Sequence, residues 1–405
     1  MAGLLKGVKV IESAMLFTGD YTGQLLADEE AEVIKLEAPG RGDYLRDFLG
    51  QVKPYTKGHS PMHITVNRNK RSVTVNLKSD EGREIFWKML KEADVFIDGN
   101  MPGATEKLGI GYEDQTKIKP DIIYGHVTGL GATGPYSLIP THGLSMNALA
   151  GTEACAVDER GLAVRVGDGL TGAGMGISVG PMYLAYGVAA ALYRRERTGQ
   201  GTYIDVGCSD AVVAQAWISV INTLNADKLV EDASGRPGPE SGKSNFYETK
   251  DGRFLLIWLI EQHFWENFCR SAGRPDLIDY GDGNKDKVVD WGDESLRPIL
   301  RDVFLTKTLD EWMEIFAAND CAIVPASQPA DLLKDKHLLH RQAVVVQDHP
   351  TAGPLWVSGN PIKVPGETYR VYRHAPALGE HTDSYLEEMG YMKEQIQQWK
   401  GQGIV

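Results

Sequence analysis

The stretch VKVIESAMLFTGDYTGQLLADEEAEVIKL, residues 8–36, decides the fold class of this chain. VKVIES (8–13) and VIKL (33–36) are short runs rich in β-branched residues, which is typical of strands, and the residues from Tyr21 to Asp28 between them are helix-like. A strand, a helix and a second strand make a βαβ unit, whose two strands are parallel. The stretch therefore predicts an α/β protein built on a parallel sheet.

The same alternation continues through the first half of the chain. A helix is predicted over 79–92, with Ser79 and Asp80 at its amino-terminal cap. Strands that alternate with helices favour a mainly parallel sheet covered by helices on both faces. The further strands are predicted at 72–77, 94–98, 122–127 and 203–206.

Residues 226–335 have a different character. They contain a β-hairpin pattern around Asp251-Gly252 and two amphipathic helices. Strand-like runs and a helical pair return from about residue 341. We therefore predict a large Rossmann-like domain made of 1–225 and 336–405, with a smaller α+β domain inserted between them. The two amphipathic helices are predicted near 261–271 and 309–318.

The composition excludes several classes of function. The chain carries a formal net charge of −13, and we expect neither nucleic acid nor an anionic membrane as a partner, because both bind broad basic patches. The first residues lack the apolar run of a secretory signal, and no apolar span of about 20 residues would cross a bilayer. The four cysteines have no paired or metal-ligand spacing, and the ten histidines are dispersed. We expect a cytoplasmic protein with reduced core cysteines and no metal.

A glycine-rich stretch, RVGDGLTGAGMG (165–176), contains a Gly-x-Gly-x-x-Gly pattern with Asp168 between its first two glycines. A dinucleotide-binding fingerprint also needs a strand before it, for which AVRV (163–166) is a short candidate, a helix after it, which is plausible here, and an acidic residue about 20 positions further on. Asp205 comes too late for the last of these. A second match to the pattern, 129–134, is followed directly by Pro135. Two matches in one glycine-rich chain show that the pattern has little specificity here. We therefore expect neither a nicotinamide nor a flavin cofactor. Asp168 itself has two interpretations: an accessible carboxylate between small residues, or the N-cap of the following helix.

Three glycines near Asp168 are spaced four apart: Gly172, Gly176 and Gly180. On a helix they would form a smooth stripe that another backbone could approach closely. Pro181 would then kink this helix or open a new one at its first turn. The spacing predicts a close contact between this helix and another segment.

A series of segments in fixed order resembles the class III CoA-transferases, also called the CaiB/BaiF family. The family contains formyl-CoA:oxalate and crotonobetainyl-CoA:carnitine CoA-transferases as well as 2-methylacyl-CoA racemases. The resemblance covers nearly the whole chain but is loose over 226–340. It implies a Rossmann-like large domain built from both chain ends, an inserted small domain, and a homodimer of two interlocked rings. The segments that carry the resemblance are 4–46, 67–86, 93–113, 129–136, 191–212 and 375–390.

The resemblance places Asp168 at the position of the nucleophile of the transferases. Its carboxylate would attack an acyl-CoA thioester to give a mixed anhydride, and the released CoA thiolate would then form an aspartyl-CoA thioester. Acyl-CoA and a carboxylic acid are thus the expected substrates, with CoA as the exchanged group. The loop 234–243 corresponds to a glycine-rich lid in oxalate-specific members, although it has fewer glycines here. The resemblance assigns CoA binding to Phe17, Thr18, Val75 to Lys78, Gly99, Asn100, Met101 and Lys107.

Three positions depart from the family pattern. Asp20 stands where the family usually has proline, Glu30 where it has glycine, and Ala38 where some members have arginine. These departures concern the detailed CoA contacts more than the fold. Lys78 and Lys107 suit the phosphates of CoA, but each alone could equally be a solvated surface lysine.

His142 opens an alternative function. In the racemases of this family a His-Asp motif lies at this point, and the histidine works with the equivalent of Asp168 to move the α-proton of a 2-methylacyl-CoA. Here Gly143 follows the histidine and breaks the motif, while the transferases often carry an aromatic residue there. The chain is thus interpreted as a CoA-transferase, with a racemase as the alternative. A third interpretation, a CoA-ester binding protein without turnover, would leave Asp168 as a helix cap only.

Aromatic residues of the small domain bear on the acyl group. They would favour a larger apolar acyl group over oxalate if they lined the substrate site, and they could equally belong to the core of that domain. The residues concerned are Phe246, Tyr247, Trp258 and Trp265. The sequence itself does not name the acceptor acid.

Overall fold

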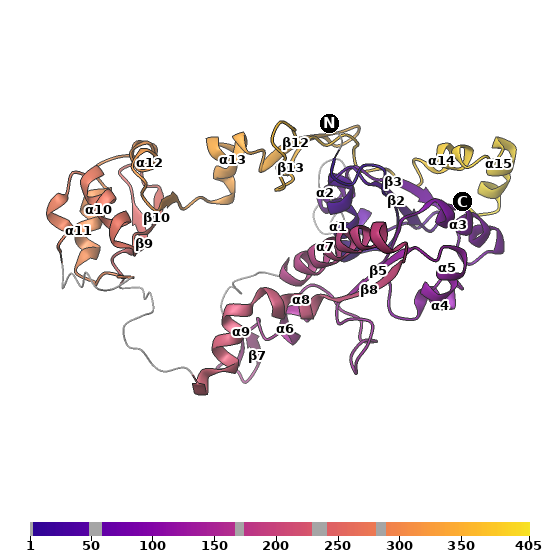
Figure 1. Cartoon of the computed structure of the whole chain (residues 1–405), viewed down its shortest axis with the longest axis horizontal. Helices are drawn as coiled ribbons and strands as arrows, with labels where there is room; N and C mark the ends of the chain where they lie inside the picture. Colours follow the sequence, from indigo (N-terminus) through magenta and orange to yellow (C-terminus); the bar gives the residue numbers. More distant parts are fainter. Residues whose placement is uncertain (1–2, 48–58, 167–173, 229–240, 281–288) are drawn as a thin grey trace. The chain divides into compact units, whose positions relative to one another are not determined.

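The computed structural model describes residues 3–47, 59–166, 174–228, 241–280 and 289–405, and Figure 1 labels its elements. The chain forms two compact units. The larger unit contains Met1–Ala226 and Gln342–Val405, so both ends of the chain contribute to it. The smaller unit contains Asp227–Arg341.

A six-stranded parallel sheet is the centre of the larger unit, which confirms the predicted α/β class. Its order is β3-β2-β1-β4-β5-β8. The order runs one way from β1 through β2 to β3 and the other way through β4, so it reverses between β1 and β4. The strands are β1 (Lys9–Ser13), β2 (Glu32–Glu37), β3 (Arg71–Thr74), β4 (Val95–Asp98), β5 (Ile123–Thr128) and β8 (Thr202–Gly207).

Helices cover both faces of this sheet, because successive strand residues point to opposite sides. Val10 of β1 packs in one core with Leu184, whereas its neighbour Ile11 packs in the other core with Phe86 and Trp399. Helices α1 and α7 contribute side chains to the first core, and α3 and α15 contribute side chains to the second. The helices of the unit are α1 (Leu16–Asp28), α2 (Pro61–Asn67), α3 (Asp80–Glu92), α4 (Ala104–Lys107), α5 (Tyr112–Ile118), α6 (Leu144–Leu149), α7 (Met175–Thr198), α8 (Cys208–Gln215), α9 (Trp217–Leu224), α14 (Thr382–Glu388) and α15 (Lys393–Gly401).

Local signals in the sequence set several of these elements. Helix α3 begins as predicted, because the Ser79 hydroxyl accepts the backbone N–H of Gly82 and caps the helix. Glu30, which stands where the family has glycine, lies in the turn between α1 and β2 with a φ of 64°. That left-handed conformation is the one glycine adopts without strain, which explains the family preference.

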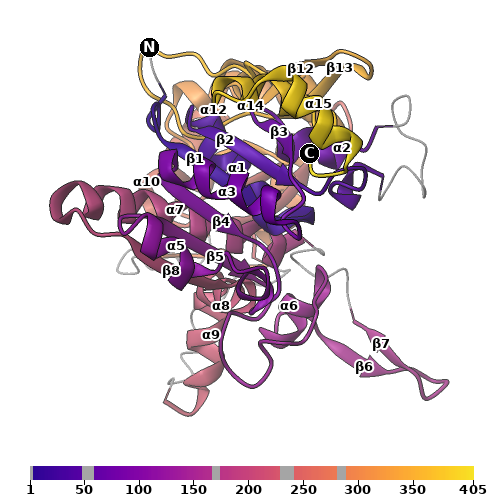
Figure 2. The same ribbon diagram turned by 90° about the vertical axis from the view of Figure 1, so that its right-hand side faces the viewer.

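The strand expected before the glycine-rich stretch forms, but outside the parallel sheet. β7 (Ala163–Arg165) pairs in antiparallel fashion with β6 (Cys155–Val157), and the hairpin projects away from the sheet in Figure 2. A dinucleotide fingerprint requires a strand of the parallel sheet at this point, so the structure agrees with the rejection of that motif. The expectation that all cysteines lie in the core was wrong for Cys155, which is exposed on this hairpin.

The predicted glycine stripe lies within the large unit. A Cβ added at Gly176 would come within 2.7 Å of the Cβ of Met146, and one added at Gly180 would overlap the Sγ of Cys208. These glycines therefore let α7 approach α6 and α8 of the same chain. The close neighbours of Gly176 and Gly180 in the described part of the chain are thus intramolecular, and Gly172 lies outside the described residues.

Helix α7 continues through Pro181 without ending there. Among the described residues it is the helix whose length and apolar composition would suffice to cross a membrane, a property that core helices share. Leu184 and Val188 of α7 are fully buried in the core on one face of the sheet. The contacts of α7 with the sheet are those of a core helix.

The smaller unit is an antiparallel three-stranded sheet packed on helices. The hairpin predicted around Asp251-Gly252 is confirmed: β9 and β10 are antiparallel, and Gly252 has a φ of 74° in the turn. Tyr247 and Trp265 belong to the core of this unit, whereas Phe246 and Trp258 are exposed. The elements are β9 (Ser244–Glu248), β10 (Phe254–Trp258), β11 (Ile323–Pro325), α10 (Gln262–Ser271), α11 (Leu296–Phe304), α12 (Leu309–Ala318) and α13 (Lys336–His340). The returning strands of the large unit, β12 (Val344–His349) and β13 (Gly353–Ser358), form a separate hairpin.

Candidate active site

The reversal of strand order between β1 and β4 creates the place where open α/β sheets bind ligands, at the carboxyl ends of the strands. The backbone N–H of Gly99 and the side-chain amide of Asn100 both donate to the carbonyl of Ser13, over 3.1 and 2.9 Å. A Cβ at Gly99 would come within 2.7 Å of the Cβ of Ala14. The segments that follow β1 and β4 are therefore in direct contact at this point, and the glycine makes that contact possible.

Two of the groups that the resemblance assigns to CoA, 17–18 and 99–101, meet at this reversal point. Phe17 and Thr18 are half-buried in the first turn of α1, directly after β1. Gly99 and Asn100 are half-buried directly after β4, and Met101 is exposed. Two groups about 80 positions apart in the sequence thus occupy neighbouring places on one edge of the sheet.

Val75 to Lys78 lie on the same edge but not at the reversal point. They follow β3, the outer strand, where Val75 is buried and Lys78 is exposed. The N–H of Asn76 donates to the carbonyl of Ile404, so the end of the chain fixes this turn. Lys107 is exposed at the end of α4. Among the described residues neither Lys78 nor Lys107 has an ion-pair partner, and their role in CoA binding remains a prediction.

A buried polar group that sequence reasoning missed supports the segment after β4. Nδ1 of His126 lies 2.9 Å from the hydroxyl of Tyr203, and Nε2 lies 2.9 Å from the carbonyl of Asn100. A carbonyl can only accept, so Nε2 carries the proton and donates to Asn100. Burial raises the pKa of Tyr203, which keeps the phenol protonated as the donor to Nδ1. The chain from Tyr203 through His126 therefore holds the backbone of Asn100.

Asp98, the last residue of β4, belongs to the same polar group. Its Oδ2 accepts the hydroxyl of Tyr124 over 2.6 Å and that of Thr105 over 3.0 Å. Asp98 is buried, as is His126, although both are polar. Polar residues at the carboxyl ends of neighbouring strands are the signal that could have identified this group from the sequence.

Asp168, the predicted nucleophile, lies outside the described residues together with Gly167, Gly169 and Gly172. Helix α7 begins at Met175 with Gly174 as its N-cap. The interpretation of Asp168 as the N-cap of a following helical turn lies outside the described residues and stays a prediction. The loop 234–243 is described only from residue 241 onward, so its predicted role as a lid is not tested.

Both ends of the segment that carries Asp168 are anchored at α6 and the turn that follows it. Before the segment, Arg165 pairs with Glu153 over 2.6 Å, and the N–H of Val166 donates to the carbonyl of Ala154 over 2.9 Å. After the segment, the N–H of Gly176 donates to Oδ1 of Asn147 over 3.0 Å. Asn147 is fully buried and its Nδ2 donates to Glu153 over 3.1 Å. Helix α6 and the turn that follows it thus hold both ends of the segment that carries Asp168.

His142 precedes α6 in an exposed turn. Its carbonyl accepts the N–H of Ser145 over 2.7 Å, and its own N–H donates to the hydroxyl of Ser145 over 3.3 Å. Within the described part of the chain the imidazole has no hydrogen-bond partner. The structure places His142 near the start of the element that anchors the Asp168 segment, but it does not describe the two side chains together.

The described residues contain no group of three or more side chains arranged to hold a metal ion. The histidines are nevertheless less dispersed than the sequence indicates. The rings of His59 and His349 lie 4.8 Å apart between centroids, and those of His349 and His374 lie 5.6 Å apart. His374 is engaged with Glu380, and Nδ1 of His349 accepts the N–H of Ala352 over 3.1 Å.

Comparison with known proteins agrees with the architecture. The chain is 30% identical over 406 residues to (R)-2-hydroxy-4-methylpentanoate CoA-transferase of Clostridioides difficile, covering 99% of both chains. It is 29% identical over 389 residues to human succinyl-CoA:glutarate CoA-transferase, covering 95% of this chain and 86% of that protein. The crystal structure of a CAIB/BAIF family protein from Brucella suis shares the fold, with a TM-score of 0.72 and 24% identity over 96% of this chain and 100% of that one. The model of the family described as CoA-transferase family III matches residues 5–382. The chain therefore belongs to CoA-transferase family III.

Proposed function

We propose that this protein transfers CoA from an acyl-CoA thioester to a free carboxylic acid. The observation that carries the proposal is the meeting of Phe17 and Thr18 with Gly99 to Met101 at the reversal point of the sheet. Ligands of open α/β sheets bind at this point, and the resemblance to CoA-transferases had assigned these residues to CoA. The two curated relatives compared above are both CoA-transferases.

Asp168 supplies the nucleophile in this proposal. Its carboxylate oxygen attacks the thioester carbonyl, the C–S bond breaks, and an aspartyl mixed anhydride and the CoA thiolate result. The thiolate then attacks the aspartyl carbonyl, which releases the donor acid and leaves an aspartyl-CoA thioester. The acceptor carboxylate repeats these two steps in reverse and departs as its CoA ester.

The surrounding chain has two tasks in this scheme. Each addition places negative charge on a carbonyl oxygen, and backbone N–H groups next to small residues are suited to stabilise it; Gly167 and Gly169 flank Asp168. Water would hydrolyse both the mixed anhydride and the aspartyl-CoA thioester. The site must therefore exclude solvent and hold Asp168 in a fixed position against the substrate. Anchoring through Asn147 and Glu153 supports that fixed position.

The acceptor acid is not named by this proposal. One relative is named for a hydroxylated, branched monocarboxylic acid and the other for a dicarboxylic acid, so relatives of similar identity differ in the acid. Phe246 and Trp258 remain candidates for contact with the acyl group because they are exposed, whereas Tyr247 and Trp265 serve the core of the smaller unit.

A racemase remains the alternative only by resemblance. His142 would have to serve as the second base, and it is followed by Gly143 and exposed in a turn. None of the described contacts favours this function over transfer, so transfer is the function proposed.

The interlocked homodimer is also a proposal. Helix α9 leaves its apolar side chains in solvent, and it extends away from the sheet in Figure 2. Trp217, Ile218 and Leu224 are 58%, 58% and 73% exposed, which is unusual for an apolar helix face and is typical of an interface between chains. Light scattering coupled to size-exclusion chromatography would give twice the chain mass if the proposal holds and the mass of a single chain if it does not.

A covalent intermediate tests the proposed function directly. The protein is incubated with a panel of acyl-CoA thioesters, quenched with acid and digested with trypsin, and the peptide 166–194 is examined by mass spectrometry. We expect a CoA adduct on Asp168, absent from Asp168→Ala and retained in Glu159→Ala, which removes an exposed carboxylate of the β6–β7 hairpin. An adduct that persists in Asp168→Ala would contradict the assignment of the nucleophile.

A further inference from the structure

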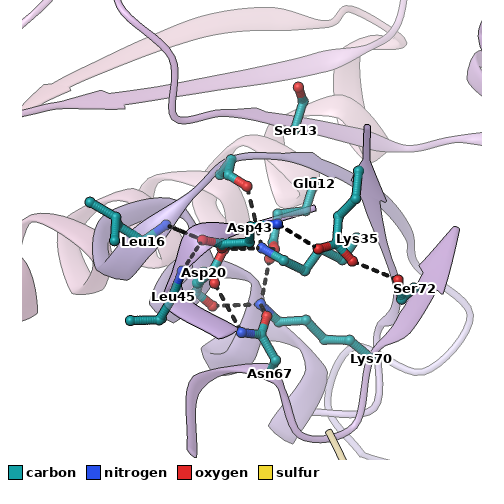
Figure 3. A network of polar contacts seen from close by, with 12 residues as sticks. Glu12, Ser13, Leu16, Asp20, Lys35, Asp43, Leu45, Asn67, Lys70 and Ser72 are labelled. Carbon is teal, nitrogen blue, oxygen red and sulfur yellow. Dashed lines mark hydrogen bonds and ion pairs between the residues drawn. The ribbon is translucent and has the colours of Figure 1, made fainter. Parts of the chain in front are cut away.

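Five charged residues lie in a buried network beside the end of β1 (Figure 3). Ions removed from water are tolerated in a protein only when they are paired and hydrogen-bonded. The network is therefore expected to fix the backbone that it contacts, because any movement would leave a buried charge unpaired. Its members are Glu12, Asp20, Lys35, Asp43 and Lys70, none more than 1% exposed.

Lys35 is the centre of this network. Its ammonium contacts Asp43 over 2.9 Å and Glu12 over 3.4 Å, and it also pairs closely with Asp20. The fourth partner is the carbonyl of Ala14, over 3.3 Å. Ala14 is the first residue after β1, so Lys35 holds the backbone at the point where the sheet ends and the turn into α1 begins.

Asp43 holds the next step of the same turn. Its carboxylate accepts the N–H of Leu16 over 3.1 and 3.2 Å and the N–H of Leu45 over 2.8 Å. Leu16 has a φ of 63°, a left-handed conformation that a leucine adopts only when its surroundings impose it. The hydrogen bond from Leu16 to Asp43 supplies that constraint. Phe17 and Thr18 follow immediately.

The pKa shifts of two carboxyl groups in the network, those of Asp20 and Asp43, fit these contacts. Burial raises the pKa of Asp20 well above its usual range, so Asp20 is the carboxyl that most readily holds a proton. Burial would raise the pKa of Asp43 as well, but the Lys35 ammonium and several hydrogen bonds lower it below its usual range. Asp20 also accepts the amide of Asn67, a contact that proline, usual at this position in the family, could not make.

From these contacts we propose that Lys35 is a positioning residue for CoA binding. Through the Ala14 carbonyl and through Asp43, it fixes the turn that holds Phe17 and Thr18 at the reversal point of the sheet. The proposal rests on the proposed function, because it takes Phe17 and Thr18 as contacts of CoA. Without the ammonium, Asp43 loses its counter-ion, Leu16 loses the constraint on its backbone, and the turn becomes mobile.

Lys70 provides a matched control within the same network. It is also fully buried, and its ammonium binds Glu12 over 2.7 Å, the carbonyl of Asp20 over 2.7 Å and the side-chain oxygen of Asn67 over 3.0 Å. None of these partners belongs to the turn from Ala14 to Thr18. Lys35→Met and Lys70→Met therefore make the same chemical change at equal burial, but only the first removes contacts to the turn.

The experiment combines hydrogen exchange with CoA binding. Both variants should unfold at lower temperature than the parent protein. Well below the unfolding temperature, we expect the amides of 14–18 to exchange at least tenfold faster in Lys35→Met than in Lys70→Met. Calorimetry should show a Kd for CoA raised at least tenfold in Lys35→Met alone, and kinetics should show a higher KM with a smaller change in kcat.

Two results would overturn the proposal. Equal exchange of 14–18 in the two variants would show that Lys35 does not position the turn, whether or not the protein binds CoA. Faster exchange without weaker binding would show that the turn is held but does not serve CoA. Failure of the parent protein to bind CoA would instead defeat the proposed function, and the exchange measurement would still decide the positioning. If Lys35→Met does not fold, Asp43→Asn, which keeps an oxygen acceptor but removes the charge, is compared with Ser72→Ala. The second change removes the bond of the Ser72 hydroxyl to Glu37 and its bond from the N–H of Gly379, neither of which belongs to the turn from Ala14 to Thr18.

Discussion

Substitution of Gly19 tests whether close packing at the reversal point forms the CoA site. Gly19 lies in the second turn of α1, and a Cβ added there would overlap the Cβ of Ala14 and lie 3.5 Å from its Cα and 3.7 Å from the Cα of Gly99. The Cβ of alanine cannot rotate away, so the backbone after β1 or the start of α1 must move. Gly19→Ala therefore perturbs the contact between the segments that follow β1 and β4 without adding a polar or bulky group.

The magnitude follows from two opposing terms. Overpacking of this kind costs about 1–3 kcal/mol, and the rigid overlap places Gly19→Ala near the upper end. Replacing glycine by alanine inside a helix raises the free energy of unfolding by about 1 kcal/mol. We therefore expect a net loss of about 2 kcal/mol in the free energy of unfolding. Gly187→Ala in α7 is the control: its added Cβ lies 3.4 Å from Ile204, an ordinary contact, so only the gain of about 1 kcal/mol remains.

Urea unfolding of both variants measures the stability difference, and steady-state kinetics measure its functional consequence. We expect the KM for acyl-CoA to rise about tenfold in Gly19→Ala, equivalent to about 1.4 kcal/mol of binding, and to stay unchanged in Gly187→Ala. Equal stability of the two variants would refute the packing argument. A destabilised Gly19→Ala with unchanged KM would show that CoA does not bind at the reversal point.

Two further predictions concern pH and charge. Burial, together with the nearby Arg46 and Lys35, lowers the pKa of His63 well below its usual value, so the unfolded chain takes up a proton first as the pH falls. The contribution of neutral His63 to the free energy of unfolding is complete above about pH 6.5 and is lost below it, by up to about 1.4 kcal/mol per pH unit. Unfolding curves from pH 8 to 5 should show that His63→Leu makes the free energy of unfolding fall less steeply with pH. An unchanged pH dependence would contradict the assignment to His63. Lys78→Ala and Lys107→Ala should each raise the KM for acyl-CoA about two- to tenfold at low salt and less at 0.5 M salt, since both are exposed and the proposed function assigns these cations to the phosphates of CoA. An effect that does not depend on salt would argue against phosphate contacts.

The parts of the fold that follow from local pattern could be predicted from the sequence. The βαβ unit of 8–36, the capped helix after Ser79 and the hairpin at Asp251-Gly252 each have their signal within about 30 residues. The strand at 163–165 also formed, but its partner could not be inferred, because a three-residue strand pairs with whatever the tertiary structure brings beside it. The glycine spacing predicted a close approach correctly, and the approaching segments are α6 and α8 of the same chain.

The site was predictable only where the resemblance supplied it. Lys35, Asp43 and His126 were missed, because their importance comes from burial and from partners that the fold brings together. Lys35 is the one recognisable signal among them: it is a charged residue within the apolar run of β2, whose residues from Val33 to Glu37 are all buried. A lysine in a buried strand requires anions around it, and this requirement could have led to Glu12 and Asp43.

The most direct test of the central claim is isotope tracing by mass spectrometry. The protein is incubated in deuterated water with a panel of acyl-CoA thioesters and isotopically labelled free acids. If the protein is a CoA-transferase, the labelled acid appears as its CoA ester, and no deuterium enters the α-position of the donor acyl-CoA. Deuterium at that α-position without any labelled CoA ester would contradict transfer and assign proton abstraction, with His142 as the base, instead.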